Sequence, residues 1–286
     1  MEVDFYKYHA LGNDYIVIDS NKTKINLSKD NIKLICHRNF GIGSDGILYG
    51  PIFEDGEIRL RILNPDGSEA EKSGNGIRIF SKFLVDMGYV NGKKFDLKTL
   101  GGKVSVEVID EHANLIKVDM GTTTFNSELI PVNGSAREVI NEELQIDKEI
   151  YKVTCLSIGN PHCVIPAENI SKELALRIGP YVESHERFPN RINMQLLKII
   201  DRNNIQIEIW ERGAGYTLAS GSSSCAAASA AYKLKLVDEK IKVHMPGGAI
   251  DIEIKSDGHI FMTGEVFGVA KGCFMPDIDK RVRINY

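Results

Sequence analysis

Alternating hydrophobic and polar residues predict two β-hairpins at corresponding places of the chain. Residues 95–108, FDLKTLGGKVSVEV, alternate on both sides of a Gly-Gly turn, and residues 241–254, IKVHMPGGAIDIEI, do the same. Alternation with a period of two around a glycine turn is typical of paired antiparallel strands. Apolar runs at residues 14–19 and 162–166 predict two further strands.

Two helices are predicted, and each follows a serine in a glycine-containing turn. Apolar residues recur with helical spacing after Ser73, namely Ile77, Phe80 and Leu84. After Ser220, the alanine-rich run at residues 225–231 predicts a second helix. Because this run has no polar face, we expect its helix to be enclosed by other elements.

These elements belong to an internal sequence repeat. LGNDYIVI at residues 11–18 matches IGNPHCVI at residues 158–165, and NPDGSEAEKSG at 64–74 matches ERGAGYTLASG at 211–221, both at an offset of 147 residues. The two hairpins match at an offset of 146 residues. Three matches in the same order predict two homologous halves.

With 286 residues, the chain is long enough for two domains. We expect an α/β (α+β) fold of two homologous domains, in each of which a barrel-like set of strands surrounds a central helix. Residues 1–121 would form the N-terminal domain, closed by the C-terminal segment 274–286, and residues 122–273 would form the C-terminal domain. Matched halves usually face each other about a pseudo-twofold axis, so the active site is expected in the interdomain cleft.

The amino-acid composition and net charge indicate which kind of ligand the protein binds. A net charge of -4 and a pI near 6.0 disfavour nucleic acid and favour a small molecule. The N-terminus MEVDFYKYHA is charged where a secretory signal is apolar, and no run approaches the roughly 18 apolar residues of a membrane span. We therefore expect a cytoplasmic protein that does not bind membranes. The five cysteines are widely spread and are expected to be free thiols, without a disulfide framework or a zinc site.

Two interpretations are possible for the roles of Ser73 and Ser220. Serine before a helix is most simply an N-cap, which accepts a hydrogen bond from a free backbone N–H. The repeat adds a second reading, in which both serine turns point at one cleft and the two helix N-termini hold a carboxylate between them. That arrangement suits chemistry at the carbon next to a carboxylate, with one group on each face.

Several polar residues near turn glycines are candidates for binding. An asparagine in a turn is usually structural, and this reading stays open for Asn13, Asn64, Asn160 and Asn193. Glu211 and Arg212 could bind an ammonium and a carboxylate, respectively, or could form a solvated ion pair. His162 could carry a proton, although the orientation of a neighbour is the simpler role.

Three common functional motifs are rejected or absent: the dinucleotide-binding motif, the nucleophile elbow of hydrolases and the Walker motif. GIGSDG at residues 41–46 has the spacing G-x-G-x-x-G, but no buried strand precedes it and no clear helix follows it, so we reject a dinucleotide site. Neither serine lies in a G-x-S-x-G nucleophile elbow, which disfavours a hydrolase triad. The Walker spacing is absent from the sequence.

Six collinear segments together resemble diaminopimelate epimerase: HALGNDYIV, GIGSDG, NPDGSEAEKSGNGIRIF, SIGNPHCV, RINMQ and WERGAGYTLASGSSSCAAA. The resemblance implies a cofactor-independent isomerase, using neither pyridoxal phosphate nor metal, that interconverts LL- and meso-diaminopimelate in the biosynthesis of lysine and peptidoglycan precursors. Two acid/base residues would act on opposite faces of the α-carbon. The substrate is an amino acid, and a homodimer is left open.

The resemblance also assigns roles to individual positions. Ser73 and Ser220 occupy the acid/base positions, where the family has cysteines. Backbone N–H groups at Gly74-Asn75 and Gly221-Ser222 would hold the reacting carboxylate. The remaining substrate contacts would come from Asn13, Asn64, Asn160, His162, Asn193, Glu211 and Arg212.

The chain departs from the family pattern at more than the two cysteines. Tyr216 stands where the family usually has a glutamate, and Ser222, Ser223 and Ser224 stand where it has Thr-Gly-Ala. Such coordinated differences favour a natural relative over laboratory replacement of the cysteines. Two alternatives therefore stay open: a serine variant acting on another amino acid or small carboxylate as a racemase, dehydratase or isomerase, and a non-catalytic amino-acid-binding protein.

Overall fold

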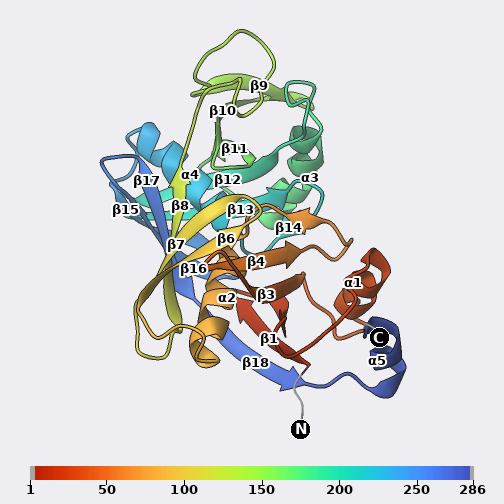
Figure 1. Cartoon of the computed structure of the whole chain (residues 1–286). Coiled ribbons are helices and arrows are strands. Elements are labelled where there is room, and N and C mark those ends of the chain that lie inside the picture. The colour runs from red at the N-terminus through yellow and green to blue at the C-terminus, as the bar shows by residue number, and fades with distance from the viewer. Residues whose placement is uncertain (1–3, 284–286) are drawn as a thin grey trace. The chain divides into compact units, whose positions relative to one another are not determined.

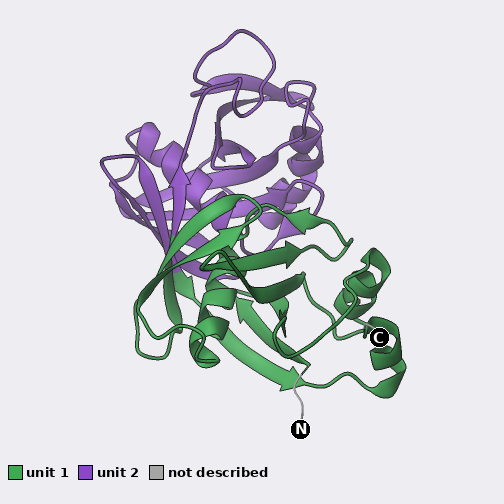
Figure 2. Cartoon of the chain, in the orientation of Figure 1, with its two compact units in different colours: residues 1–118, 264–286 green, residues 119–263 purple. Residues whose placement is uncertain are grey.

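The computed structural model describes residues 4–283 and shows a mixed α/β protein (Figure 1). It divides into two compact units, residues 1–118 with 264–286, and residues 119–263 (Figure 2). The expected two-domain α/β fold is confirmed. The expected domain limits were 1–121 with 274–286, and 122–273, so the unit limits differ from them most where the chain returns to the first unit. Among residues 4–283, no helix is both long and apolar enough to cross a membrane.

The first unit begins with a run of strands interrupted by two helices. Its elements in chain order are β1 (Phe5–Ala10), β2 (Asn13–Asp19), α1 (Lys29–Cys36), β3 (Ile47–Glu54), β4 (Glu57–Leu63), β5 (Glu69–Ala70), α2 (Gly74–Asp86), β6 (Lys94–Thr99) and β7 (Gly102–Val108). Strand β8 (Leu115–Thr122) leads out of this unit, and β18 (Phe267–Gly272) and α5 (Pro276–Val282) return to it.

The second unit has the same order of elements after an additional strand. Its elements are β9 (Glu142–Ile146), β10 (Glu149–Ser157), β11 (Pro161–Pro166), α3 (Lys172–Glu183), β12 (Asn193–Asp201), β13 (Asn204–Glu211), β14 (Gly215–Thr217), α4 (Gly221–Lys233), β15 (Lys240–Met245), β16 (Gly248–Ile254) and β17 (His259–Glu265).

Strand pairing repeats between the units. In the first, β1 and β2 pair antiparallel, β2 and β3 pair parallel across α1, and β4 runs parallel to β6. In the second, β10 and β11 pair antiparallel, β11 and β12 pair parallel across α3, and β13 runs parallel to β15. Both predicted hairpins are present, as β6–β7 and β15–β16. The internal repeat is therefore confirmed at the level of topology.

One helix in each unit is enclosed by strands. In α2, every residue from Gly74 to Leu84 is buried. In α4, all residues from Ser223 to Ala231 are buried, and this helix contacts β10, β11, β12 and β13. Enclosure on all sides explains why the alanine run of α4 lacks a polar face.

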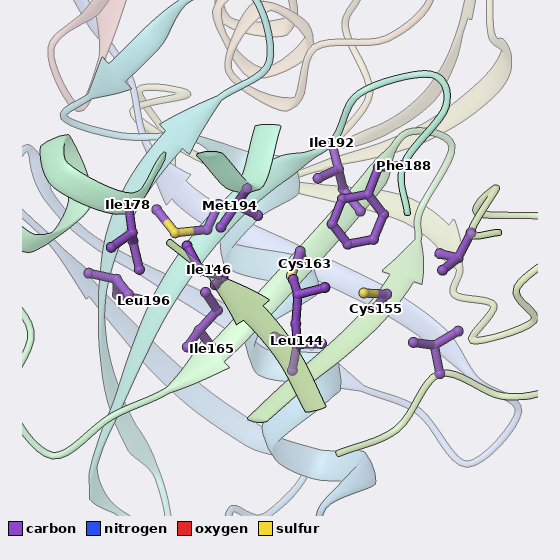
Figure 3. Close-up of a cluster of buried hydrophobic side chains, with 14 of the residues drawn as sticks. Leu144, Ile146, Cys155, Cys163, Ile165, Ile178, Phe188, Ile192, Met194 and Leu196 are labelled. Carbon is purple, nitrogen blue, oxygen red and sulfur yellow. The ribbon is translucent and has the colours of Figure 1, made fainter. Parts of the chain in front are cut away.

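Each unit has its own hydrophobic core beside the strands that carry site residues. In the first unit, Ile16, Ile18 and Ile47 of β2 and β3 pack with residues of α1 and α5, and Figure 1 shows α5 beside α1. In the second, side chains of β9 to β12 and α3 form the cluster drawn in Figure 3. Cys155 and Cys163 face each other across β10 and β11 in this cluster as free thiols. Packing of this kind fixes β2 and β11 as rigid supports.

Candidate functional site

Ser73 caps α2 and forms the centre of a half-site in the first unit. Its backbone is extended, and its Oγ accepts a hydrogen bond from the backbone N–H of Gly76 at 3.1 Å. The predicted N-cap is therefore present. The N–H groups of Gly74 and Asn75 begin the helix and have no intrahelical partner, so they can bind an anion. The Tyr15 hydroxyl lies 3.2 Å from Ser73 Oγ.

Asn13 and Asn75 are hydrogen-bonded to each other at this helix end. The Asn75 amide donates to Asn13 Oδ1 at 3.0 Å, and the Asn13 amide donates to Asp45 at 2.9 Å. Asn75 Oδ1 in turn accepts a hydrogen bond from the fully buried Arg78 at 2.8 Å. The orientation of both predicted asparagines is thus fixed by hydrogen bonds to neighbouring side chains, as a pre-organised binding site requires.

A charged cluster supports Asn13 from behind. Arg38 Nη2 lies 2.7 Å from both Asp14 and Asp45, and Lys7 Nζ lies 2.8 Å from Asp14. Burial by itself raises the pKa of Asp14, but the hydrogen bonds and charges of Arg38 and Lys7 outweigh burial and leave this pKa below its ordinary value. Asp14 therefore stays ionised and keeps this cluster neutralised around neutral pH.

Asn64 is held in a turn of its own. It directly follows β4, its backbone N–H donates to the Ser68 carbonyl at 2.8 Å, and its amide donates to Ser68 Oγ at 2.9 Å. These contacts are those of a structural turn asparagine. These hydrogen bonds join Asn64 to Ser68 and not to the group around Ser73.

Ser220 caps α4 in the second unit in the same way. Its Oγ accepts a hydrogen bond from the Ser223 backbone N–H at 3.4 Å, and the Ser222 hydroxyl lies 3.5 Å from it. Ser220 is buried, and its carbonyl accepts a hydrogen bond from the Ser224 hydroxyl at 2.8 Å. The N–H groups of Gly221 and Ser222 stand at the helix start, as those of Gly74 and Asn75 do in α2.

His162 is fully buried on β11 and is neutral. Its Nε2 lies 2.9 Å from Asn160 Oδ1. The pKa of His162 is lowered to about 3: burial is the main cause, the interaction with Gln195 partly opposes it, and the positive charge of Arg212 makes a smaller contribution in the same direction as burial. A neutral imidazole at pH 7 can orient Asn160 or exchange a hydrogen bond, but it does not hold a positive charge there.

Asn193 connects β12 to the loop that carries Glu211 and Arg212. It lies beside His162 in the parallel β11–β12 register. Its amide donates to the Pro161 carbonyl at 2.8 Å, and its Oδ1 accepts from the Arg212 backbone N–H at 3.0 Å. Arg212 is exposed, and its guanidinium donates to the Asn190 carbonyl at 3.0 Å. The structure therefore brings together five predicted residues at or directly beside the adjoining ends of β11, β12 and β13: Asn160, His162, Asn193, Glu211 and Arg212.

Sequence reasoning missed two residues that support this group. The buried Glu183 accepts hydrogen bonds from Trp210 Nε1 and from the Gly213 N–H, both at 2.7 Å, and so fixes the ends of the Glu211-Arg212 segment. The buried Gln195 donates to Ser223 Oγ at 3.0 Å. A signal existed for Gln195, because it lies two residues after Asn193 and so shares its strand face. None existed for the bonds of Glu183 to Trp210 and Gly213, because both residues are distant from it in sequence.

Two similar α/β units, each with a strand set around one buried helix, define a fold that is also found in solved structures. The chain is similar to a probable proline racemase from Agrobacterium radiobacter K84, at 14% identity and a TM-score of 0.71, over 96% of this chain and 93% of that one. It is also similar to methylitaconate-delta-isomerase, at 11% identity and a TM-score of 0.65, over 95% of each chain.

Sequence comparison identifies the protein family. The family model for diaminopimelate epimerase matches residues 5–126 and 154–268. "Diaminopimelate epimerase 2" of a Nostoc species is 56% identical over 94% of both chains, and the diaminopimelate epimerase of Moorella thermoacetica is 36% identical over 96% of this chain and 99% of that one. The chain belongs to the diaminopimelate epimerase family, a family of isomerases, and the predicted resemblance is confirmed.

Proposed function

We propose that the protein is a diaminopimelate epimerase, which interconverts LL- and meso-diaminopimelate by moving the α-proton. The observation that carries this proposal is the 56% identity to the Nostoc protein of that name over 94% of both chains. The site agrees with it, because each unit has a serine at the start of an enclosed helix with free N–H groups behind it. The proposed setting is the cytoplasm, in the biosynthesis of lysine.

In this proposal the two half-sites share one substrate. Ser73 and Ser220 take the acid/base positions on opposite faces of the α-carbon. The N–H groups of Gly74-Asn75 and Gly221-Ser222 hold the reacting carboxylate and stabilise the charge that develops as the proton leaves. The rest of the substrate is held by side chains of Asn13, Asn64, Asn160, His162, Asn193, Glu211 and Arg212.

Serine makes the proton transfer harder than cysteine does. A thiol has an ordinary pKa of about 8.5, and a helix N-terminus lowers it toward neutrality. A serine hydroxyl is much less acidic and normally acts with a partner that takes its proton. The N–H groups of the two helix N-termini, which bind the substrate carboxylate, still stabilise the carbanion. We therefore expect turnover, although slower than that of a cysteine enzyme.

Isotope exchange in deuterated water tests the proposal. Each isomer of diaminopimelate is incubated with the protein and followed by proton NMR and chiral chromatography. We expect deuterium at the α-position together with interconversion of the isomers, and loss of both in a Ser73→Ala/Ser220→Ala variant. Absence of exchange and of interconversion at high protein concentration would contradict the proposal.

The presence of serine at positions 73 and 220, where the family has cysteine, supports a second candidate function. The same proton abstraction could serve a racemase, a dehydratase or a double-bond isomerase acting on another small carboxylate, or the site could bind an amino acid without turnover. Calorimetric titration with diaminopimelate separates these functions. Binding without exchange favours the binding protein, whereas absence of both favours a different substrate.

A further inference from the structure

The Tyr15 side chain makes a direct contact with Ser73. Its hydroxyl lies 3.2 Å from Ser73 Oγ, and either oxygen can donate the hydrogen bond. Tyr15 comes from β2 and is buried, with 7% of its surface exposed. A serine hydroxyl needs a partner that accepts or supplies its proton, and an ionisable phenol within hydrogen-bond distance can do both.

The position of the Tyr15 ring is fixed by the loop before β3. A Cβ atom at Gly46 would lie 2.7 Å from Cε1 of Tyr15 and 2.7 Å from the Leu63 carbonyl oxygen, so only glycine leaves room for the ring. The Gly46 carbonyl accepts a hydrogen bond from the Ile16 N–H at 3.1 Å and ties this loop to β2. The last glycine of GIGSDG therefore has a role unrelated to nucleotides: it leaves space for the tyrosine that reaches Ser73.

The repeat shows which residue of the second half corresponds to Tyr15. Asn13 matches Asn160, and at the same offset Tyr15 matches His162. Each half thus places an ionisable side chain two residues after the matched asparagine, on the strand that precedes the parallel crossover. In the first half this side chain contacts the serine that caps the enclosed helix.

We infer that Tyr15 is a positioning residue that holds Ser73 Oγ and exchanges a proton with it, and this inference rests on the proposed epimerisation. When Ser73 protonates the carbanion, the carbon electron pair forms the new Cα–H bond and the Ser73 O–H bond breaks. The Tyr15 proton then moves to Ser73 Oγ, and the phenolate regains a proton from water, which leaves as hydroxide. In the reverse direction Tyr15 first loses its proton to solvent hydroxide; the phenolate then takes the Ser73 proton while Ser73 Oγ takes the α-proton, and the electron pair of the broken Cα–H bond stays on the carbon.

One test does not depend on turnover. Ser73→Cys is made in a background in which the exposed Cys273 is changed to serine, with and without Tyr15→Phe, and the rate of alkylation by iodoacetamide is measured against pH. Loss of the phenol should raise the pKa of the new thiol by about one unit, because a hydrogen bond to the thiolate is lost. The matched control is Ser220→Cys, whose thiol pKa should not change with Tyr15→Phe. Equal thiol pKa values at position 73 with and without the phenol would overturn the inference.

A second test uses the natural reaction. In deuterated water, Tyr15→Phe should slow α-hydrogen exchange about 100-fold for the isomer deprotonated by Ser73 and leave exchange of the other isomer near the unmodified rate. A purely structural change would slow both isomers alike, and that result or no slowing would contradict the inference. If the unmodified protein exchanges neither isomer, the proposed function fails, whereas the thiol measurement still decides the role of Tyr15.

Discussion

At the scale of single residues, the hydroxyl group of each serine has two roles: its oxygen accepts a hydrogen bond, and its hydrogen is transferred in the proposed reaction. As an N-cap, Oγ accepts a backbone hydrogen bond, a contact that stabilises a helix by about 1 kcal/mol. As an acid, the same hydroxyl must give up its proton, and this becomes easier as more donors point at the oxygen. Ser73 has such donors in the Gly76 N–H and the Tyr15 hydroxyl, and Ser220 has the Ser223 N–H.

Restoring the more acidic side chain should increase turnover. We expect the Ser73→Cys/Ser220→Cys variant to interconvert diaminopimelate isomers about 100-fold faster or more, since a well-placed acid or base contributes roughly 10²- to 10⁴-fold. The measurement is the initial rate for each isomer.

The matched control is Ser81→Cys/Ser229→Cys, two buried serines further along the same two helices that bond to backbone carbonyls. We expect no gain from this control. A gain of equal size in both double variants, or in neither, would show that the rate is not limited by the acidity of the capping side chains.

The neutral state of His162 should make stability depend on pH. Its pKa is about 3 in the folded protein and about 6.5 unfolded, so between these values only the unfolded chain binds the proton. The contribution of neutral His162 to the free energy of unfolding is therefore fully present above pH 6.5. It is lost as the pH falls toward 3, with a slope of about 1.4 kcal/mol per pH unit.

His162→Gln removes this slope. We expect the stability of the unmodified protein minus that of the variant, measured by denaturant unfolding, to fall by about 3 kcal/mol between pH 6.5 and pH 4. Taking the difference between the two proteins cancels the titration of all other groups. A difference that does not change with pH would mean that His162 is accessible to protons in the folded state.

At the scale of elements, the sequence predicted what depends on local pattern. The hairpins follow from alternation around Gly-Gly, and α2 and α4 follow from a serine cap before a helical repeat. The parallel pairing of β2 with β3 and of β11 with β12 could not be predicted in the same way, because no local rule fixes which distant strands pair. Glu183 was missed for the same reason, since its partners Trp210 and Gly213 are brought to it only by the packing of α3 on β13.

The contact between α3 and β13 should control substrate affinity. Glu183→Ala leaves the Trp210 and Gly213 N–H groups without their acceptor, at a cost of about 1–3 kcal/mol each. Because Gly213 directly follows Arg212, we expect KM to rise about tenfold or more, with a smaller change in kcat. Thermal unfolding and steady-state rates give both quantities. The control is the exposed Glu186→Ala, for which we expect neither change, and a fall in kcat alone would assign Glu183 to the chemistry.

At the scale of the whole molecule, the end of the chain completes the first unit. Strand β18 pairs with β1, so the return to this unit begins earlier than the segment 274–286 that the sequence suggested. The Asp4 carboxylate accepts hydrogen bonds from the Phe274 N–H at 2.8 Å and from Arg283 at 2.7 Å. Val282 of α5 is fully buried beside residues of β2 and α1.

Because α5 packs in the core of the first unit, a substitution in α5 should destabilise this unit and not the second. Val282→Ala should destabilise the first unit by about 2 kcal/mol, because it leaves a cavity in the core shared by β2, α1 and α5. Hydrogen exchange followed by mass spectrometry should therefore accelerate in β1, β2 and α1 and remain unchanged in β11, β12 and α4. The control is Val269→Ala on β18, whose side chain is 56% exposed and should have little effect. Equal acceleration in both units would mean that the two halves unfold as one cooperative body, and the closing segment would then stabilise the second unit as strongly as the first.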